Sequence, residues 1–191
     1  MRPVAAPLFG INVPDGFEHR DDFISAAEEA SLAGDIGRLE FAEFEMRGVV
    51  ARRRVAFFGA SYDRGSAPSA PLPDFLLPMR ERLAAWAGIP SAAFAMALIN
   101  EYRPGAPIGW HRDAPQYDFV AGISLLSPAR MRFRTYVAPS TAGGTRRVAT
   151  HELPLLPRSA YLMRGRSRSE YEHSIPAVTE LRYSITFRTL R

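Results

Sequence analysis

Apolar and polar residues alternate with a two-residue period through much of the second half of the chain, the pattern of β-strands with one buried face. Turn-forming residues separate these segments, as at Pro104-Gly105 and Ser127-Pro128. The predicted strands cover residues 94–102, 119–126, 131–137, 147–153, 160–164 and 182–188. Many short strands at close spacing favour two stacked sheets, and we predict a double-sheet jelly roll in residues 92–191.

Apolar spacings of the helical type occur mainly in the first half of the chain. One predicted helix begins after Asp21-Asp22 and ends at Gly34, and a second begins at Pro73-Asp74 and ends at Gly88. Extended segments are predicted at residues 8–13, 39–46 and 49–58. We therefore predict one α+β domain over residues 1–191, with an N-terminal helical extension in residues 1–91 packed outside the core in residues 92–191.

The composition is that of an ordinary globular protein, since 47% of the 191 residues are hydrophobic and 23% are charged. No apolar run approaches the length of a membrane span, and neither a signal peptide nor a membrane partner is expected. Cysteine is absent, which excludes disulfides and thiolate metal sites. We expect a cytoplasmic monomer.

All 24 basic residues are arginines, planar cations that bind carboxylates and phosphates through paired hydrogen bonds. Residues 1–50 contain 4 arginines and 10 acidic residues, whereas residues 51–191 contain 20 arginines and 10 acidic residues. An acidic front and a basic remainder suit an anionic partner, and the charge favours nucleic acid.

A candidate metal site begins with His111 and Asp113. If this segment is extended, the two side chains point to the same face, with Cα atoms about 6 to 7 Å apart. Two histidines and one carboxylate that leave coordination positions open form the facial triad of non-haem Fe(II) oxygenases, so a distant second histidine is required. A His-x-Asp pair is also common as a surface pair or a capping interaction. The other histidines are His19, His151 and His173.

The segment 182–188 has one polar and one apolar face. As a strand it places Tyr183, Ile185 and Phe187 on the apolar face, and Arg182, Ser184, Thr186 and Arg188 on the polar face. The Cα atoms of the two arginines would lie about 20 Å apart, so their side chains could converge on the two ends of a small dicarboxylate. A surface strand with two ordinary arginines is the alternative. Asn100 and Tyr102 add a second pair of donors.

Four motifs in this order along the chain resemble the AlkB family of Fe(II)- and 2-oxoglutarate-dependent dioxygenases. They are Asn100-x-Tyr102, Trp110-His111-x-Asp113, His173-Ser174-Ile175-Pro176 and R-x-S-x-T-F-R at residues 182–188. The resemblance runs from about residue 14 to residue 191. It implies a jelly roll, also called a double-stranded β-helix. It also implies that His111, Asp113 and His173 bind iron, that Arg188 pairs with the 1-carboxylate of 2-oxoglutarate, and that Arg182 binds the 5-carboxylate with help from Asn100 and Tyr102.

The family resemblance also implies a reaction. O2 and 2-oxoglutarate are consumed, succinate and CO2 are released, and an N-alkyl group on a nucleobase of DNA or RNA is hydroxylated and lost as an aldehyde. Residues 53–59 with Tyr62 resemble the family's nucleotide-recognition lid, and single-stranded nucleic acid is the expected form of the substrate because its base need not be unpaired. The candidate substrate contacts are Arg52, Arg53, Arg54, Phe57, Phe58, Tyr62, Trp110, Arg132 and Arg134, with further basic candidates at Arg130, Arg164, Arg166 and Arg168.

Some assignments differ from this pattern or stay open. Base-repairing members of the family carry an acid two positions after the metal-binding aspartate, where this chain has Pro115, so Gln116 or Asp118 would have to replace it. Trp110 is expected in the core rather than in a wall of the site, and His19 and His151 are expected to be structural or exposed. The alternatives in function are the same chemistry on a protein or small-molecule substrate, or a non-catalytic module that binds nucleic acid.

Overall fold

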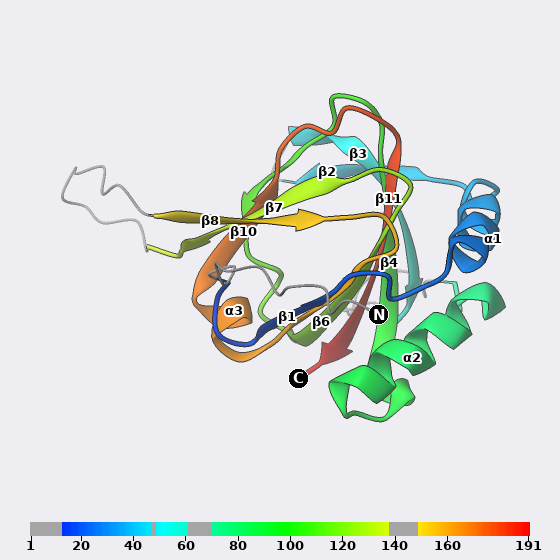
Figure 1. Ribbon diagram of the computed structural model, residues 1–191, viewed down its shortest axis with the longest axis horizontal. Helices are drawn as coiled ribbons and strands as arrows, with labels where there is room; N and C mark the ends of the chain where they lie inside the picture. The colour runs from blue at the N-terminus through cyan, green and yellow to red at the C-terminus, as the bar shows by residue number, and fades with distance from the viewer. Residues whose placement is uncertain (1–12, 47–48, 61–69, 138–148) are drawn as a thin grey trace, which may run out of the picture.

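Two antiparallel sheets form the framework of the computed structural model, which describes residues 13–46, 49–60, 70–137 and 149–191 (Figure 1). The larger sheet has the order β1-β9-β6-β11-β4-β3-β2, and the smaller sheet has the order β5-β10-β7-β8. The strands of the larger sheet are β1 (Phe17–Arg20), β2 (Ala42–Met46), β3 (Val49–Gly59), β4 (Phe94–Tyr102), β6 (Tyr117–Leu125), β9 (Ala160–Met163) and β11 (Arg182–Leu190). Those of the smaller sheet are β5 (Ile108–His111), β7 (Ala129–Thr135), β8 (Thr150–Leu155) and β10 (Tyr171–Ile175). The predicted α+β fold with a jelly-roll core is confirmed.

The central strand β11 follows the predicted alternation. It pairs with β4 on one side and β6 on the other. Its apolar residues Tyr183, Ile185 and Phe187 belong to the core beneath the helices. Its alternate residues Arg182 and Arg188 therefore point to the other face, into the space between the two sheets.

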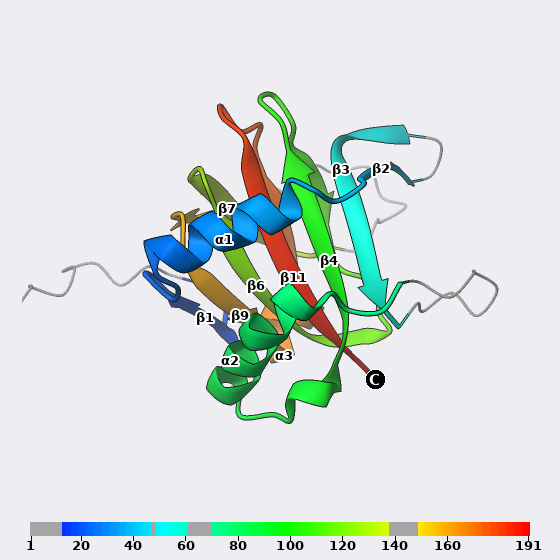
Figure 2. The same ribbon diagram turned by 90° about the vertical axis from the view of Figure 1, so that its right-hand side faces the viewer.

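The helices α1 (Ala26–Ile36) and α2 (Leu77–Ala87) lie across the outer face of the larger sheet (Figure 2). The short helices η1 (Asp74–Leu76) and η2 (Ser91–Ala93) flank α2, and α3 (Gly165–Ser169) follows β9. Leu83 of α2 is fully buried in the same core as Ile99 and Ile185 of the sheet. Burial of this apolar face holds the helices against the sheet.

The first helix differs from its prediction at its C-terminal end. It passes Gly34 and ends at Ile36, with Gly37 as its C-cap. A glycine inside a helix costs about 1 kcal/mol relative to alanine, whereas the next turn buries Ile36 completely. The helix begins with a capping box formed by Ser25 and Glu28. The second helix ends as predicted, at Gly88 in the left-handed conformation.

Among the strands and α-helices, the sequence did not predict β1, β5, α3 and β10. The extended segment expected at residues 8–13 lies outside the described residues except for Val13. Residues before 92 contribute β1, β2 and β3 to the larger sheet in addition to the helices. The boundary expected after residue 91 falls just before β4, and strands from both sides of it belong to the larger sheet. The division into an N-terminal extension and a catalytic core stays a prediction. In the described ranges no helix is long and apolar enough to cross a bilayer.

Candidate active site

A pocket between the two sheets contains all seven residues that the sequence marked for iron or 2-oxoglutarate. Side chains from β4, β5, β6, β7, β9, β10 and β11 line it. The predicted residues in its lining are Asn100, Tyr102, His111, Asp113, His173, Arg182 and Arg188. Pairing of β11 with β4 gathers four of these residues on the larger sheet, and pairing of β5 with β10 brings the two histidines together on the smaller sheet. The pocket lies where the two sheets face each other.

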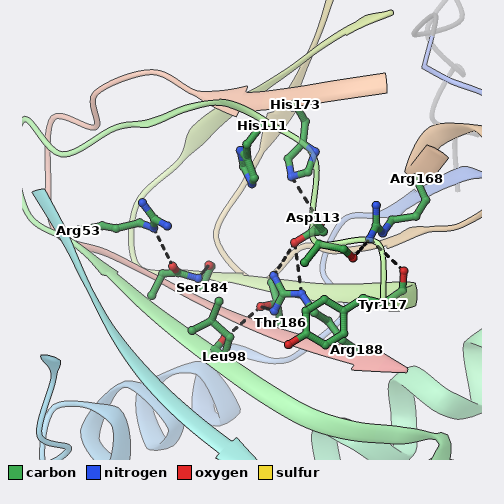
Figure 3. Close-up of polar contacts among 12 residues, drawn as sticks. Arg53, Leu98, His111, Asp113, Tyr117, Arg168, His173, Ser184, Thr186 and Arg188 are labelled. Atoms are coloured by element: carbon green, nitrogen blue, oxygen red, sulfur yellow. Dashed lines mark hydrogen bonds and ion pairs between the residues drawn. The ribbon is translucent and has the colours of Figure 1, made fainter. Parts of the chain in front are cut away.

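The two histidines face each other on neighbouring strands of the smaller sheet. His111 is in register with His173, and their ring centroids are 4.2 Å apart. Asp113 lies two residues beyond the end of β5, and its Oδ2 is 3.8 Å from Nε2 of His173 (Figure 3). Nδ1 of His111 lies 2.9 Å from the carbonyl oxygen of Gly109, which leaves Nε2 as the nitrogen able to bind a metal.

Arg188 engages the carboxylate of this cluster. Its Nη2 and Nε lie 2.9 and 3.3 Å from Oδ1 of Asp113, and its Nη1 donates to Oγ1 of Thr186 at 3.0 Å. Burial alone would raise the pKa of Asp113, but Arg188 and the two histidines hold that pKa well below its usual value. Asp113 is therefore an anion at neutral pH, as a metal ligand must be.

Both histidines are neutral at neutral pH. Burial, reinforced by His111, lowers the pKa of His173 to about 3 although Asp113 opposes the shift. Burial also lowers the pKa of His111. A neutral imidazole is the form that binds a metal.

The donor set fits a facial triad in chemistry. In the described parts of the chain, no three His, Asp or Glu side chains already form a closed ligand cluster. Asp113 is instead held by Arg188 at 2.9 Å. Arg188 contacts Oδ1, which leaves Oδ2 on the side of His173 for a divalent cation. Two neutral imidazoles beside one carboxylate are the ligands that Fe(II) takes in this class of site.

Arg182 provides a free guanidinium end at another part of the pocket. The residue is 1% exposed, and its Nε donates to Oγ of Ser124 at 3.2 Å. Its Nη1 is buried without a hydrogen-bond partner among the described residues. A buried donor without a partner is costly, and a carboxylate is the acceptor that suits a guanidinium. Arg182 lies over the ring of Tyr102, with Cζ 5.0 Å from the centroid.

The predicted lid residues are divided between the two faces of β3. Arg53 is buried, and its Nε donates to Oδ1 of Asn100 at 3.2 Å. The next residue, Arg54, points to the opposite face and pairs with Glu101 through bonds of 2.8 and 2.9 Å. By the same alternation Phe57 shares the face of Arg53 and is 44% exposed, whereas Phe58 packs against the core under the helices. Arg52 is exposed and alternates with Arg53, and Tyr62 lies outside the described residues.

Trp110, Arg132 and Arg134 form a separate cluster on the outer face of the smaller sheet. The Cζ atoms of Arg132 and Arg134 lie 5.1 and 4.4 Å from the Trp110 ring centroid. Trp110 belongs neither to the pocket lining nor to a buried core, so its expected place in the core is wrong. Trp110 immediately precedes His111 in β5, and the inward direction of His111 turns Trp110 outward because side chains alternate along a strand. Arg134 also pairs with Glu172 at 2.6 Å.

The basic cluster expected at Arg164, Arg166 and Arg168 is not a set of free cations. Arg168 is buried in α3, and its Nη2 donates to the carbonyl oxygens of Ala114 and Tyr117 at 2.5 and 2.9 Å. It therefore anchors the segment after Asp113, as Figure 3 shows. The two exposed members of the cluster pair with acids, Arg164 with Glu18 and Arg166 with Glu170. Outside the cluster, Arg130 of β7 pairs with Glu152.

Other candidates lie away from the pocket. Neither His19 nor His151 lines it, as expected. Gln116 and Asp118, considered as substitutes for an acid at Pro115, do not line it either. Asp118 is exposed and lies 3.7 Å from Arg191. Sequence reasoning missed Tyr161, which does line the pocket and carries no motif of its own.

A family model described as the 2OG-Fe(II) oxygenase superfamily matches residues 55–188, which contain the whole pocket. The chain belongs to this superfamily. The superfamily implies Fe(II), 2-oxoglutarate and O2, so the prediction of these cofactors and of the dioxygenase class is confirmed at the level of the family.

Comparisons with individual proteins support the AlkB type. The chain is 26% identical over 194 residues to the "Alkylated DNA repair protein ALKBH8 homolog" of Arabidopsis thaliana, covering 91% of this chain and 54% of that protein. It is 31% identical over 96 residues to the "Probable RNA/DNA demethylase ALKBH6" of Danio rerio, covering 50% of this chain and 40% of that protein. The chain thus spans about half or less of the length of these curated relatives.

Solved structures share the fold at low sequence identity. OsALKBH1 matches with a TM-score of 0.67 and 13% identity over 93% of this chain and 99% of that chain. A Pseudomonas putida prolyl-4-hydroxylase matches with a TM-score of 0.62 and 14% identity over 92% of this chain and 93% of that chain. These matches show the fold, and the superfamily model together with the sequence relatives confirms the predicted resemblance to AlkB-type 2-oxoglutarate oxygenases.

Proposed function

We propose that this protein is an Fe(II)- and 2-oxoglutarate-dependent dioxygenase that oxidatively dealkylates N-alkylated nucleobases in DNA or RNA. One observation carries the chemistry: two neutral imidazoles, an ionised carboxylate and a buried guanidinium end without a partner line the same pocket. Membership of the 2OG-Fe(II) oxygenase superfamily supports this assignment of the pocket.

The metal would be held by His111, Asp113 and His173. Iron with 2-oxoglutarate and O2 supplies the oxidising chemistry when bound. For an N-methyl base, one oxygen atom enters succinate and the other enters the methyl group, which leaves as formaldehyde, while 2-oxoglutarate loses CO2. The protein's part is to hold the reactants and to exclude water from a pocket enclosed by two sheets.

The two arginines of β11 would bind the ends of 2-oxoglutarate. Arg182 would take the 5-carboxylate, because its Nη1 lacks a partner and Tyr102 lies beside it. Asn100, which donates to Oγ of Ser184 at 3.4 Å, would assist from β4. Arg188 would bind the 1-carboxylate and keep its bond to Asp113, which ties the cosubstrate to the metal ligand.

Alkylated nucleic acid as the substrate is supported by the relatives and by charge. The names of both sequence relatives refer to repair or demethylation of DNA or RNA. The chain carries a net charge of +4, and β3 presents Arg53 and Phe57 on the pocket side. Basic groups that contact the backbone and aromatic rings that stack on bases are the usual combination for binding a single strand. Single-stranded preference, the monomeric state and a cytoplasmic location stay predictions.

The test is a panel of methylated single- and double-stranded DNA and RNA oligonucleotides incubated with Fe(II), ascorbate and 2-oxoglutarate. We expect mass spectrometry to show loss of the methyl mark together with an equal amount of succinate. The variant His111→Ala should release none. Failure to release succinate with any methylated oligonucleotide would overturn the proposal.

Pro115 supports a second candidate, the same oxidation on a protein or small-molecule substrate. The acid that base-repairing members carry at this position is absent, and neither Gln116 nor Asp118 reaches the pocket. Turnover on nucleic acid should weaken steeply as salt increases, because phosphate contacts release counterions. Salt-insensitive turnover in the absence of nucleic acid would favour this second candidate.

A further inference from the structure

Tyr161 of β9 reaches into the pocket across a glycine of the neighbouring strand. It is in register with Gly122 of β6, which is in register with Thr186 of β11 on its other side. A Cβ atom at Gly122 would lie 2.4 Å from ring atoms of Tyr161 and 2.6 Å from its hydroxyl oxygen. The phenol therefore occupies the space that a side chain at position 122 would fill, and it points toward the strand that carries both arginines.

The ring of Tyr161 is held on its other side by Phe17 of β1. The two rings are stacked, with centroids 5.7 Å apart and an interplanar angle of 19°. Tyr161 is 7% exposed, so its position is defined by packing against β1 and β6. A ring confined in this way keeps its hydroxyl at one place in the pocket.

Tyr161 lines the pocket together with Asp113, Arg188 and Arg182. The charges of all three residues act on its hydroxyl. Burial, with Asp113 adding to it, raises the pKa of Tyr161 well above its usual value, so the group is a protonated donor. The hydrogen bonds among the described side chains that line the pocket do not include this hydroxyl. A donor that faces a pocket can find its acceptor on a bound ligand.

We propose that Tyr161 is a further cosubstrate-binding residue, whose hydroxyl donates a hydrogen bond to a 2-oxo dicarboxylate held between Arg182 and Arg188, at a place that Gly122 keeps open. The inference rests on the cosubstrate of the proposed function and adds a further residue to those that would bind it there. The oxygen atoms of such a ligand are all acceptors, which matches a protonated phenol. Gly122 and Tyr161 act as a pair, since any side chain at position 122 would displace the ring.

The variant Tyr161→Phe tests the donor without changing the packing. We expect the dissociation constant for 2-oxoglutarate, measured by calorimetry on the Fe(II)-loaded protein without oxygen, to rise about 10-fold, the value of one hydrogen bond to a charged acceptor. The Michaelis constant for the same cosubstrate should rise by the same factor with little change in kcat. Tyr183→Phe, on the opposite face of β11, is the matched control and should leave the dissociation constant unchanged.

Thermal unfolding separates this role from a structural one. Tyr161→Phe should leave Tm unchanged without cosubstrate, because the ring keeps its packing, and should reduce the increase in Tm that 2-oxoglutarate causes. If the ring only packed, the dissociation constant and this increase in Tm would match those of the unaltered protein, and the inference would be wrong.

Gly122→Ala tests the pair. It should weaken 2-oxoglutarate binding in the unaltered background by displacing the Tyr161 hydroxyl, and it should add little to the loss in Tyr161→Phe, where no hydroxyl remains. Equal losses in both backgrounds would show that Gly122 acts independently of the hydroxyl and would overturn the pairing. If Gly122→Ala does not fold, Tyr161→Phe decides alone. Absence of 2-oxoglutarate binding to the unaltered protein would overturn the proposed function as well, whereas equal binding by the unaltered protein and Tyr161→Phe would overturn this inference only.

Discussion

Arg188 of β11 binds the carboxylate of Asp113 across the space between the sheets, with Nη2 2.9 Å from Oδ1. Both side chains are less than a tenth exposed. The pair therefore links the larger sheet, which carries the predicted cosubstrate residues, to the segment that follows β5 of the smaller sheet, whose strands carry His111 and His173.

Removing the charge of Asp113 should affect both stability and metal binding. Asp113→Asn leaves the buried Arg188 guanidinium without its anion, and we expect the free energy of unfolding to fall by about 3 kcal/mol. Fe(II) binding and succinate release should be lost together. Urea unfolding and Fe(II) titration measure the two effects. Asp118→Asn, an exposed carboxylate 3.7 Å from Arg191, is the control and should change neither.

Arg182 should determine the affinity for 2-oxoglutarate. Arg182→Met keeps much of the side-chain volume but removes the guanidinium that has a free Nη1. We expect the Michaelis constant for this cosubstrate to rise at least about 10-fold, because a paired guanidinium–carboxylate contact is lost. Arg103→Met, an exposed residue that pairs with Glu101 on the other face of the sheet, is the comparison. An unchanged Michaelis constant in Arg182→Met would mean that another residue binds the 5-carboxylate.

Two neighbouring aromatic residues of β3 should give opposite results. Phe57→Ala removes an exposed ring on the pocket side and should weaken binding of a single-stranded oligonucleotide by about 10-fold, the value of one stacked base, with little change in Tm. Phe58→Ala removes a ring that packs under the helices and should lower stability by about 2 kcal/mol without changing oligonucleotide affinity. Fluorescence anisotropy and thermal unfolding distinguish them. If Phe57→Ala binds the oligonucleotide normally, β3 is not part of the substrate surface.

The start of α1 should be sensitive to acid. Hydrogen bonds from Arg82 and Ser25 lower the pKa of Glu28 to about 2, from 4.5 in the unfolded chain. Because the folded pKa is the lower one, the stabilisation is present above pH 4.5 and is lost as the pH falls toward 2. The pair is partly exposed, so Glu28→Gln should cost at most about 1 kcal/mol at pH 7.

The measurement is the difference in unfolding free energy between Glu28→Gln and the unaltered protein, followed from pH 7 to acid. This difference should shrink as Glu28 becomes protonated. Glu81→Gln, an exposed glutamate of α2, is the control. A difference that stays constant throughout the acid range would contradict the assignment.

Local pattern determined much of the fold and most of the site. Residues 182–188 have a two-residue period, and that period alone places Arg182 and Arg188 on one face, as the structure has them. The motif His111-x-Asp113 with a distant His173 predicted a metal site, because two histidines and one carboxylate are the ligand types of the facial triad. These properties depend on neighbouring residues or on residue type, which can be read directly from the sequence.

Only the tertiary structure decided which residues meet across strands that lie far apart in the sequence. Register divides Arg53 from Arg54, places Trp110 on the outside, and brings Tyr161 over Gly122. The tertiary structure also makes Arg168, predicted as a member of a basic cluster, an anchor for the segment after Asp113. A shift of one residue in pairing exchanges the two faces of a strand, and the pairing is set by packing of the whole core rather than by any local pattern. The sequence by itself therefore determined the chemical groups of the pocket, and the fold decided their partners.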